Sequence, residues 1–305
     1  MTNLIKKCIS GLKNPKKRTI FLAQHGFFRN MTDEDFLKMQ FKNVFGYPLD
    51  LEHPKTFNEK LQWLKLYDRK PEYTMMVDKY EVKHYVASLI GEEYIIKTLG
   101  IWDSFDKIDF AKLPNKFVLK CTHDSGGLII CTDKSKLNLS YAKKKIEKSL
   151  SNNYYMQNRE WPYKDVRRRI LAEEYIEDNT SSDLVDYKLM CFNGKVKATF
   201  TCTSRHSQDG LKVTFYDSDW NMMPFERYYP KEKIPLPKPS SYSEMVRLAE
   251  ILSKNIPFVR VDFYEIKGKP YFGELTFYPG SGMEPFTPSE WDEKFGRWIS
   301  LPSKK

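Results

Sequence analysis

The chain has 305 residues, 41% hydrophobic and 15% aromatic, a composition typical of a folded globular protein and too apolar for a disordered one. Its formal charge of +10 indicates acidic partners, such as nucleotides, anionic sugars, nucleic acid or an anionic membrane surface, without choosing among them. The five cysteines are odd in number and lack CxxC spacing, which argues against a disulfide framework or a zinc site. No apolar run reaches the ~20 residues of a membrane span, so we expect a cytoplasmic protein.

The first thirty residues are basic and contain a few large apolar side chains. Such a segment is either a solvated arm or a contact with anionic lipid head groups, which would place the protein at the inner face of the membrane. Charge runs of this kind favour the solvated arm. The basic residues are Lys6, Lys7, Lys13, Lys16, Lys17 and Arg18.

Residues 30–95 carry helical patterns. The stretch TFNEKLQWLKLY begins with a capping box, Thr56 and Glu59, and repeats its apolar residues at helical spacing. A second helix is predicted to begin at Asp78. Its inward residues are predicted to be Val82, Tyr85, Val86 and Leu89.

From residue 113 onward, segments rich in β-forming residues take over. They are KFVLKC, LIICT, RRRILAEEYI, DYKLMCF, KVKATFTC and KVTFYD, separated by Gly, Asn and Asp turns. Helices are predicted at about 140–151, behind Ser140, and at about 243–255, behind Ser243. The pattern predicts an α+β fold, with helices first and a mixed, largely antiparallel sheet system after them.

The stretch VRVDFYEIKGKPYFGELTFYPGSG predicts a hairpin around Lys267–Gly268. This turn sets Asp262 opposite or nearly opposite Glu274, and alternation places Arg260 and Thr276 on the same face. Like charges opposite each other destabilise a sheet, so something must compensate them, and Mg²⁺ with phosphate ligands does this well. The alternative is a solvated edge hairpin with incidental acids. The aromatic and apolar flanks favour a buried strand pair instead.

The segment LPNKFVLKCTHDSGGLIICTD offers groups that would hold phosphates. A strand ends near Lys120, and the loop from His123 to Gly127 follows it. Glycines let backbone N–H groups approach an anion, and the lysine adds a positive charge. The loop does not match the P-loop pattern GxxxxGK[ST].

These motifs together, in the order K…SGG…EEYI…DYK…RxDF…GExTFxPGSG, resemble the ATP-grasp superfamily. The closest resemblance is to its TupA-like branch, which is found in bacterial gene clusters for cell-surface polysaccharide and teichuronopeptide biosynthesis. It runs from about Phe57 to the C-terminus and includes FNEKLQWLKLYDR, DKYEVKHYV, EEYIED, DYKLMCFNGK and FGRWISLP. The resemblance implies two small α+β lobes that clasp Mg·ATP, at residues 76–305, behind a helical N-terminal region at 1–75.

The resemblance also implies a role for individual residues. Asp262 and Glu274 look like the metal-binding acids, and Thr276 stands where the family usually has a third ligand, Asn. Arg260, Lys188 and Arg205 look like the catalytic cations that meet the transferred phosphate and the acyl acceptor. The residues that look like nucleotide contacts are Lys79, Lys120, His123, Ser125, Gly126, Gly127 and the hinge Glu173, Glu174, Tyr175 and Ile176.

The implied activity is an ATP-dependent carboxylate–amine ligase that uses ATP and Mg²⁺ and joins an acidic sugar or amino acid to an amine in capsule or cell-wall polysaccharide assembly. Two alternatives stay open: a metal-dependent glycosyltransferase with a nucleotide sugar, and a nonenzymatic polysaccharide-assembly protein. Nucleic acid is not expected as a partner, because the aromatic residues form no clear stacking platform.

Overall fold

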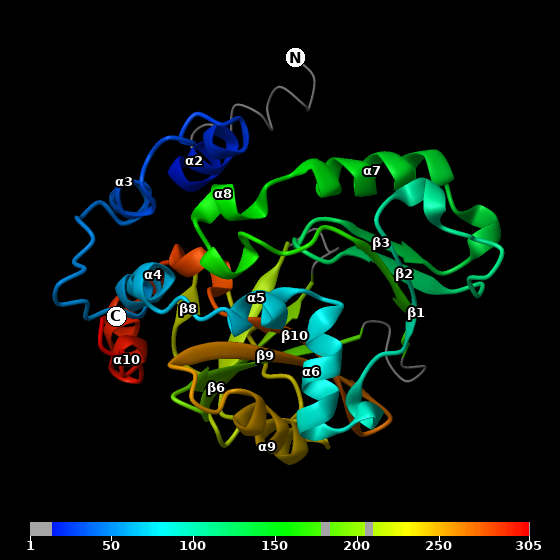
Figure 1. Ribbon diagram of the computed structural model, residues 1–305. Coiled ribbons are helices and arrows are strands. Elements are labelled where there is room, and N and C mark those ends of the chain that lie inside the picture. Colours follow the sequence, from blue (N-terminus) through cyan, green and yellow to red (C-terminus); the bar gives the residue numbers. More distant parts are fainter. Residues whose placement is uncertain (1–13, 178–183, 205–209, 305) are drawn as a thin grey trace.

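A computed structural model describes residues 14–177, 184–204 and 210–304, and it has two lobes, each built on a β-sheet (Figure 1). The helices are α2 (Pro15–Gln24), α3 (Asp33–Phe45), α4 (Phe57–Tyr67), α5 (Glu72–Val77), α6 (Glu81–Ile90), α7 (Leu139–Ser151), α8 (Tyr154–Asn158), α9 (Tyr242–Leu252) and α10 (Glu290–Arg297). The strands are β1 (Thr98–Trp102), β2 (Phe117–Cys121), β3 (Leu128–Cys131), β4 (Ile170–Glu174), β5 (Asp186–Phe192), β6 (Lys195–Thr203), β7 (Lys212–Tyr216), β8 (Glu226–Arg227), β9 (Phe258–Ile266), β10 (Lys269–Thr276) and β11 (Phe286–Thr287).

The first lobe contains a four-stranded antiparallel sheet in the order β1-β4-β2-β3. Helix α7 covers one face of this sheet (Figure 1), and Ala142 and Ile146 of the helix pack against Leu119 and Ala172. Because side chains alternate along a strand, Lys120 and Glu173 lie on the opposite face, which α7 leaves uncovered.

The second lobe contains a five-stranded antiparallel sheet in the order β10-β9-β5-β6-β7. Helix α9 covers one face, where Cys191 reaches the Ala249 carbonyl. On the other face, Lys188 pairs with Asp262 and Phe192 pairs with Phe258. This face is therefore charged at one end and aromatic at the other.

The early helices belong to the core of the second lobe. Phe57 of α4 lies 4.9 Å from Phe258 and 5.9 Å from Phe295 of α10, measured between ring centroids. Around it, α3, α4 and α10 share a single buried cluster with the five-stranded sheet. The predicted boundary at residue 75 remains a prediction.

The hairpin register agrees with the sequence prediction. Lys267 and Gly268 both have positive φ angles, 51° and 75°, as a tight two-residue hairpin turn requires. A bulge between Phe272 and Glu274 shifts the register, and Glu274 then lies directly opposite Asp262. The two acids are therefore neighbours on one face of the sheet.

Three helix details differ from the sequence prediction. Helix α7 is capped by Asn138 rather than Ser140, and α9 begins at Tyr242 behind Ser241. Helix α6 begins at Glu81, because Asp78 caps the preceding turn with its side chain. Leu89 was predicted to face inward, but it is exposed at the end of this short helix.

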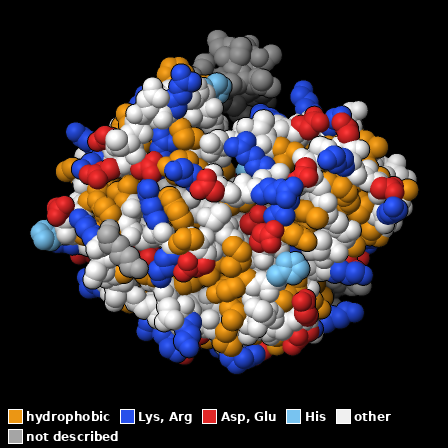
Figure 2. All heavy atoms as spheres, in the orientation of Figure 1, with side chains coloured by type: hydrophobic (Ala, Val, Ile, Leu, Met, Phe, Trp, Pro, Cys, Tyr) orange, Lys and Arg blue, Asp and Glu red, His pale blue; other side chains and the backbone are white. Residues whose placement is uncertain are grey.

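Figure 2 shows lysine and arginine side chains interspersed with acidic ones across one face of the molecule, rather than gathered in one basic patch. Within the described residues, no helix has the length and apolar character needed to cross a bilayer. The four cysteines in the described part of the chain, Cys121, Cys131, Cys191 and Cys202, are free.

Gly296 allows α10 to touch the start of α4. A Cβ atom there would lie 2.1 Å from the Lys55 carbonyl oxygen and 2.9 Å from the Phe57 nitrogen. Since both neighbours are backbone atoms, they cannot rotate away. We expect Gly296→Ala to lower the free energy of unfolding by about 1–3 kcal/mol, measured from urea midpoints. Glu293→Ala, an exposed change in the same helix, is the control, and equal midpoints for the two variants would contradict this packing.

Candidate active site

Four charged side chains form one cluster on β5, β9 and β10. The Arg260 Nε donates to Asp262 Oδ1 at 2.6 Å, and its Nη2 donates to Asp262 Oδ2 and Glu274 Oε1, both at 2.7 Å. The Lys188 Nζ donates to Asp262 Oδ2 as well. Arg260 thus lies between the two facing carboxylates and compensates both.

A third acid, Asp186, joins this cluster. Its Oδ2 lies 2.5 Å from the Lys188 Nζ, one pleat along β5. Three carboxylates and two cations therefore lie together in the cluster. Sequence reasoning missed Asp186, although its position two residues before Lys188 places it on the same face.

The two facing acids differ in accessibility. Asp262 is buried, and burial raises its pKa while Arg260 and Lys188 oppose the rise. The side chain of Glu274 is 40% exposed. Its surroundings partly desolvate it, but Arg260, Lys188 and Lys79 outweigh this effect and lower the pKa of Glu274 to about 2. Glu274 is thus an ionised, accessible carboxylate at neutral pH.

The oxygen atoms of this cluster are of the chemical type that a hard divalent cation prefers as ligands. They are carboxylate oxygens and the Thr276 hydroxyl, which donates to Glu274 Oε1 at 3.2 Å. No group of three or more His, Cys, Asp or Glu side chains that could hold a metal occurs within 14–177, 184–204 and 210–304. Both Asp262 oxygens bond to Arg260 or Lys188, so Asp262 becomes a metal ligand only if these cations move to another anion. The residues fit Mg²⁺ on that condition.

In the first lobe, Glu173 lies between two lysines. Its Oε2 is 2.5 Å from the Lys120 Nζ, and its Oε1 is 2.5 Å from the Lys83 Nζ. Burial acts to raise the pKa of Glu173, but Lys120 and Lys83 outweigh it, so the pKa lies below the ordinary value of 4.5. Two of the predicted nucleotide contacts, Lys120 and Glu173, are therefore brought together.

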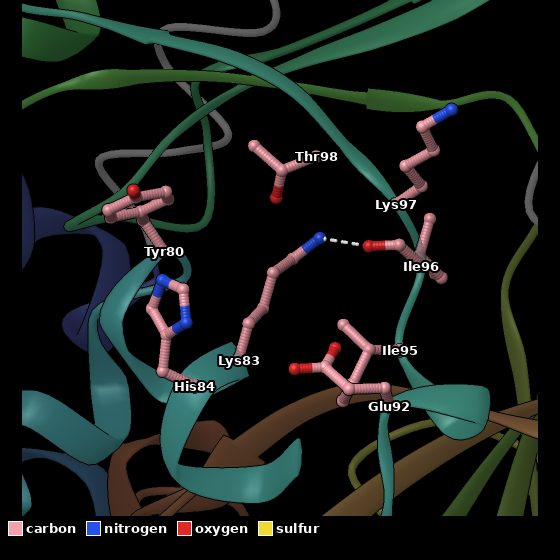
Figure 3. A pocket seen from close by; sticks show the side chains of 8 residues that line it. All are labelled: Tyr80, Lys83, His84, Glu92, Ile95, Ile96, Lys97 and Thr98. Carbon is pink, nitrogen blue, oxygen red and sulfur yellow. Dashed lines mark hydrogen bonds between the residues drawn. The ribbon is translucent and has the colours of Figure 1, made fainter.

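Lys83 is a residue that sequence reasoning missed. Its Nζ also donates to the Ile96 carbonyl at 2.5 Å, at the side of a cavity of about 390 Å³ (Figure 3). Burial lowers the pKa of Lys83, and Glu173 opposes this. The sequence pattern could have indicated an inward-facing Lys83, because this residue follows Lys79 by four residues and lies between the inward Val82 and Val86.

The loop after β2 is held by its own acid. Asp124 Oδ1 accepts from the Gly127 N–H at 3.1 Å, and Asp124 Oδ2 accepts from the Ser149 hydroxyl. A Cβ on Gly127 would lie 2.5 Å from both the Cys121 sulfur and the Ser149 hydroxyl. Gly127 is therefore required for packing, and its N–H is already used inside the loop.

Other predicted contacts surround this loop. The Lys79 Nζ donates to the Asp124 carbonyl, which places a cation at the loop. Ser125 and Gly126 are exposed at its tip. His123 is buried, with a side chain only 2% exposed, and its ring nitrogens have no hydrogen-bond partner within the described part of the chain. Burial lowers the pKa of His123, so its ring is neutral at pH 7.

The predicted hinge begins in the last two residues of β4 and continues past its end. The Glu174 N–H donates to the Lys97 carbonyl, and the Lys116 ammonium lies 5.9 Å from the centre of the Tyr175 ring. Ile176 is half-buried. Arg205, predicted as a catalytic cation, lies outside the described residues.

The model of the family described as TupA-like ATP-grasp matches residues 59–300. The chain belongs to the TupA-like ATP-grasp family. It has the α+β ATP-grasp fold, preceded by a helical region. No curated protein matches the sequence.

Several solved structures are similar to this member of the family at low sequence identity. A D-alanine–D-alanine ligase from Bacillus anthracis, complexed with ATP, is 17% identical over 74% of this chain and 65% of its own, with a TM-score of 0.43. The ATP-grasp ligase PsnB, complexed with a minimal precursor, Mg and ADP, is 9% identical over 72% of this chain and 57% of its own, with a TM-score of 0.39. A RimK domain ATP-grasp protein from Sphaerobacter thermophilus is 11% identical over 76% and 70% of the chains, with a TM-score of 0.41.

This chain spans less than two thirds of the length of the Bacillus anthracis ligase and of PsnB. The substrates of those enzymes do not carry over to it by similarity.

The Glu173 ion pairs predict a pH-dependent stability. At pH 7, Glu173→Gln leaves Lys83 and Lys120 without their shared carboxylate, and we expect a loss of about 3 kcal/mol in the free energy of unfolding. Because the folded-state pKa of Glu173 lies below 4.5, its contribution is complete above that pH and is lost as the pH falls through the folded-state pKa.

The measurement is urea unfolding of both proteins from pH 7 to pH 3. The difference between wild type and Glu173→Gln should be constant down to about pH 5 and then shrink. Glu174→Gln, an exposed neighbour, is the matched control and should change little. A difference that stays constant down to pH 3 would contradict the depressed pKa.

Proposed function

We propose that this protein is an ATP-dependent carboxylate–amine ligase that joins an acidic sugar or amino acid to an amine in capsule or cell-wall polysaccharide biosynthesis. The observation that carries the proposal is the cluster of Arg260, Lys188, Asp262 and Glu274, close enough to Lys79 for that lysine to lower the pKa of Glu274. Lys79 also contacts the loop after β2. Cations from the first part of the chain and carboxylates from the second thus converge, as Mg·ATP binding requires.

The cluster as it stands supports an exchange of partners. Arg260 and Lys188 neutralise Asp262 and Glu274 when no phosphate is present. If a phosphate ligand drew the two cations to its oxygens, Asp262, Glu274 and Thr276 would be the residues that hold Mg²⁺. The metal, when bound, neutralises charge on the phosphates.

The chemistry follows from what these side chains can do. The substrate carboxylate attacks the terminal phosphorus of ATP, the bond to ADP breaks, and an acyl phosphate forms. The amine then attacks the acyl carbon, inorganic phosphate leaves, and the amine loses a proton, which gives an amide. Arg260 and Lys188 stabilise the negative charge on the transferring group, and Lys120 and Lys79 position the nucleotide.

The antiparallel sheets also bear on the glycosyltransferase alternative. Among the described strands, every named strand pair is antiparallel. A parallel sheet with crossover helices, the usual frame for a nucleotide sugar at a strand-end crevice, is not formed by them. No observation favours this alternative over the ligase.

Contact of the basic N-terminus with anionic lipid head groups is the alternative to a solvated arm, and it can be tested. In α2, Lys17 and Arg18 are exposed, and the large apolar side chains of Phe21 and Phe27 are exposed close by in sequence. If this contact forms, the full chain should cosediment with anionic vesicles at low salt and remain in the supernatant at high salt. Equal sedimentation with neutral vesicles would rule out an electrostatic contact.

The nucleotide site is tested by thermal stabilisation with Mg·ATP, Mg·UDP and UDP-glucose. A ligand that binds only the folded state at a hundredfold excess over Kd adds about 2.7 kcal/mol, and a tenfold weaker affinity reduces this to about 1.4 kcal/mol. We expect stabilisation by ATP that depends on Mg²⁺, and we expect Glu274→Gln to weaken it at least tenfold. Stabilisation by the uridine nucleotides alone would overturn the ligase proposal.

Glu274→Gln tests the proposed Mg·ATP site more directly than Asp262→Asn does. Glu274 is partly exposed and bonds to Arg260 through one oxygen, whereas Asp262 is buried and bonds to both Arg260 and Lys188. Removing the Asp262 charge therefore destabilises the fold as well as the site. Glu290→Gln on the exposed side of α10 is the matched control and should keep the full response to Mg·ATP.

A further inference from the structure

A second cavity adjoins the charged cluster. Its volume is about 140 Å³, and Arg260 and Lys188 form one part of its wall. Strands β6 and β7 supply an apolar side, with Phe200, Val213 and Phe215. A molecule bound there would lie directly beside the transferring phosphoryl group whose negative charge Arg260 and Lys188 stabilise in the proposed reaction.

The cavity is also lined by a buried arginine that the proposed chemistry does not use. Arg227 of β8 is 2% exposed, and its Nη2 donates to the Pro279 carbonyl at 2.9 Å. Its guanidinium carbon lies 5.3 Å from the Phe57 ring centre and 5.4 Å from that of Phe286. Within the described residues, its Nε has no hydrogen-bond partner. A buried donor without a partner costs about 1–3 kcal/mol, so a position of this kind points to a ligand group.

Arg227 is paired loosely with an acid that also lines the cavity. The Nη1 of Arg227 lies 3.4 Å from Glu284 Oε2, which is longer than a good charged hydrogen bond. Burial lowers the pKa of Arg227, yet a guanidinium stays charged at neutral pH. Beside the charged cluster, Arg227 and Glu284 therefore present one further positive and one negative group side by side to the cavity.

We propose that this cavity binds the amine substrate of the ligase and that this substrate is a free amino acid, with its carboxylate on Arg227 and its amino group beside Glu284. The inference rests on the proposed function for the role of substrate, but not for the binding itself. The planar guanidinium matches a carboxylate with two parallel hydrogen bonds, which would satisfy the open Nε.

Charge distinguishes an amino acid from a simple acid at this position. A monocarboxylate or a uronic acid would bring a second negative charge next to Glu284, which is unfavourable in a buried site. An amino acid brings its own positive charge and leaves the net charge of the cavity unchanged. The carboxylate that becomes phosphorylated then belongs to the other substrate.

Size limits the ligand as well. Engineered cavities of about 150 Å³ with apolar walls hold one benzene molecule. A volume of about 140 Å³ therefore takes one amino acid or one comparable small molecule. The aromatic wall of Phe200 and Phe215, whose ring centres lie 4.8 Å apart, favours an apolar portion on that side of the ligand.

The test is ligand-observed NMR with matched sets of probes, with and without Mg²⁺ and a non-hydrolysable ATP analogue. Each set contains an amino acid, its deaminated acid and its decarboxylated amine: L-alanine, propionate and ethylamine, and L-glutamate, glutarate and 4-aminobutyrate. Glucuronate represents the uronic acids. We expect one amino acid to bind at least tenfold more tightly than both of its analogues. Equal or tighter binding of glucuronate or of a deaminated acid, or binding of no probe under either condition, would overturn the inference.

Two variants assign the binding to this cavity. Arg227→Lys keeps the charge but removes the planar guanidinium, and it should weaken binding of the amino acid at least tenfold. The control, Arg247→Lys on the exposed side of α9, should leave this binding unchanged. Glu284→Gln should abolish the preference for the amino acid over its deaminated analogue, and it is informative even if Arg227→Lys does not fold. Unchanged binding in Glu284→Gln would overturn the assignment.

The outcomes separate this inference from the proposed function. Stabilisation by Mg·ATP together with no amino-acid binding would overturn the inference alone. Amino-acid binding that is lost in Glu284→Gln, without any stabilisation by Mg·ATP, would keep the cavity as an amino-acid site and overturn the ligase.

Discussion

The bridge that Arg260 makes between Asp262 and Glu274 is the interaction on which the site depends. The β9–β10 hairpin places two carboxylates directly opposite each other, an arrangement that a sheet does not tolerate without a cation. Arg260, two residues before Asp262 on the same face, supplies that cation, and Lys188 on the neighbouring strand adds a second. The same charges that stabilise the ligand-free sheet are the ones that a nucleotide phosphate and a metal would redistribute.

The N-terminal helices support the other side of this site. Gln62 of α4 donates to the Gly282 carbonyl at 2.8 Å, and the buried Lys65 donates to the Ser281 carbonyl at 2.9 Å. The loop they hold, η5 (Pro279–Gly282), follows β10 and forms part of the cavity next to Arg260. Ser281 is held from a third direction by Glu160. The sequence FNEKLQWLKLY therefore does more than fill the core, because its polar residues fix a loop of the candidate site.

Much of the fold could be predicted from local patterns. The capping box at Thr56 and Glu59, the hairpin turn at Lys267–Gly268 and the extent of β5 depend on short-range spacing, and the structure agrees with each. Strand β1 was not predicted, because TLGIW has only five residues and no alternation between polar and apolar positions. Lys83 was missed for a different reason: a lysine on a helix is usually solvated, and only the acid it meets in space makes it a buried charge.

The sequence by itself determined which side chains share a face of each strand, because alternation along a strand is a local property of the backbone. It therefore placed Arg260 on the same face as Asp262 and brought Glu274 close to them, whereas the bulge between Phe272 and Glu274 decided that the two acids lie directly opposite each other. Only the tertiary structure decided which cations compensate them, since Lys188 and Lys79 come from segments far away in the chain. The tertiary structure also decided the role of Arg227, because its burial against Phe57, its pairing with Glu284 and its place in the cavity depend on segments that lie far apart in the chain. Packing across such separations has no local signature in the sequence.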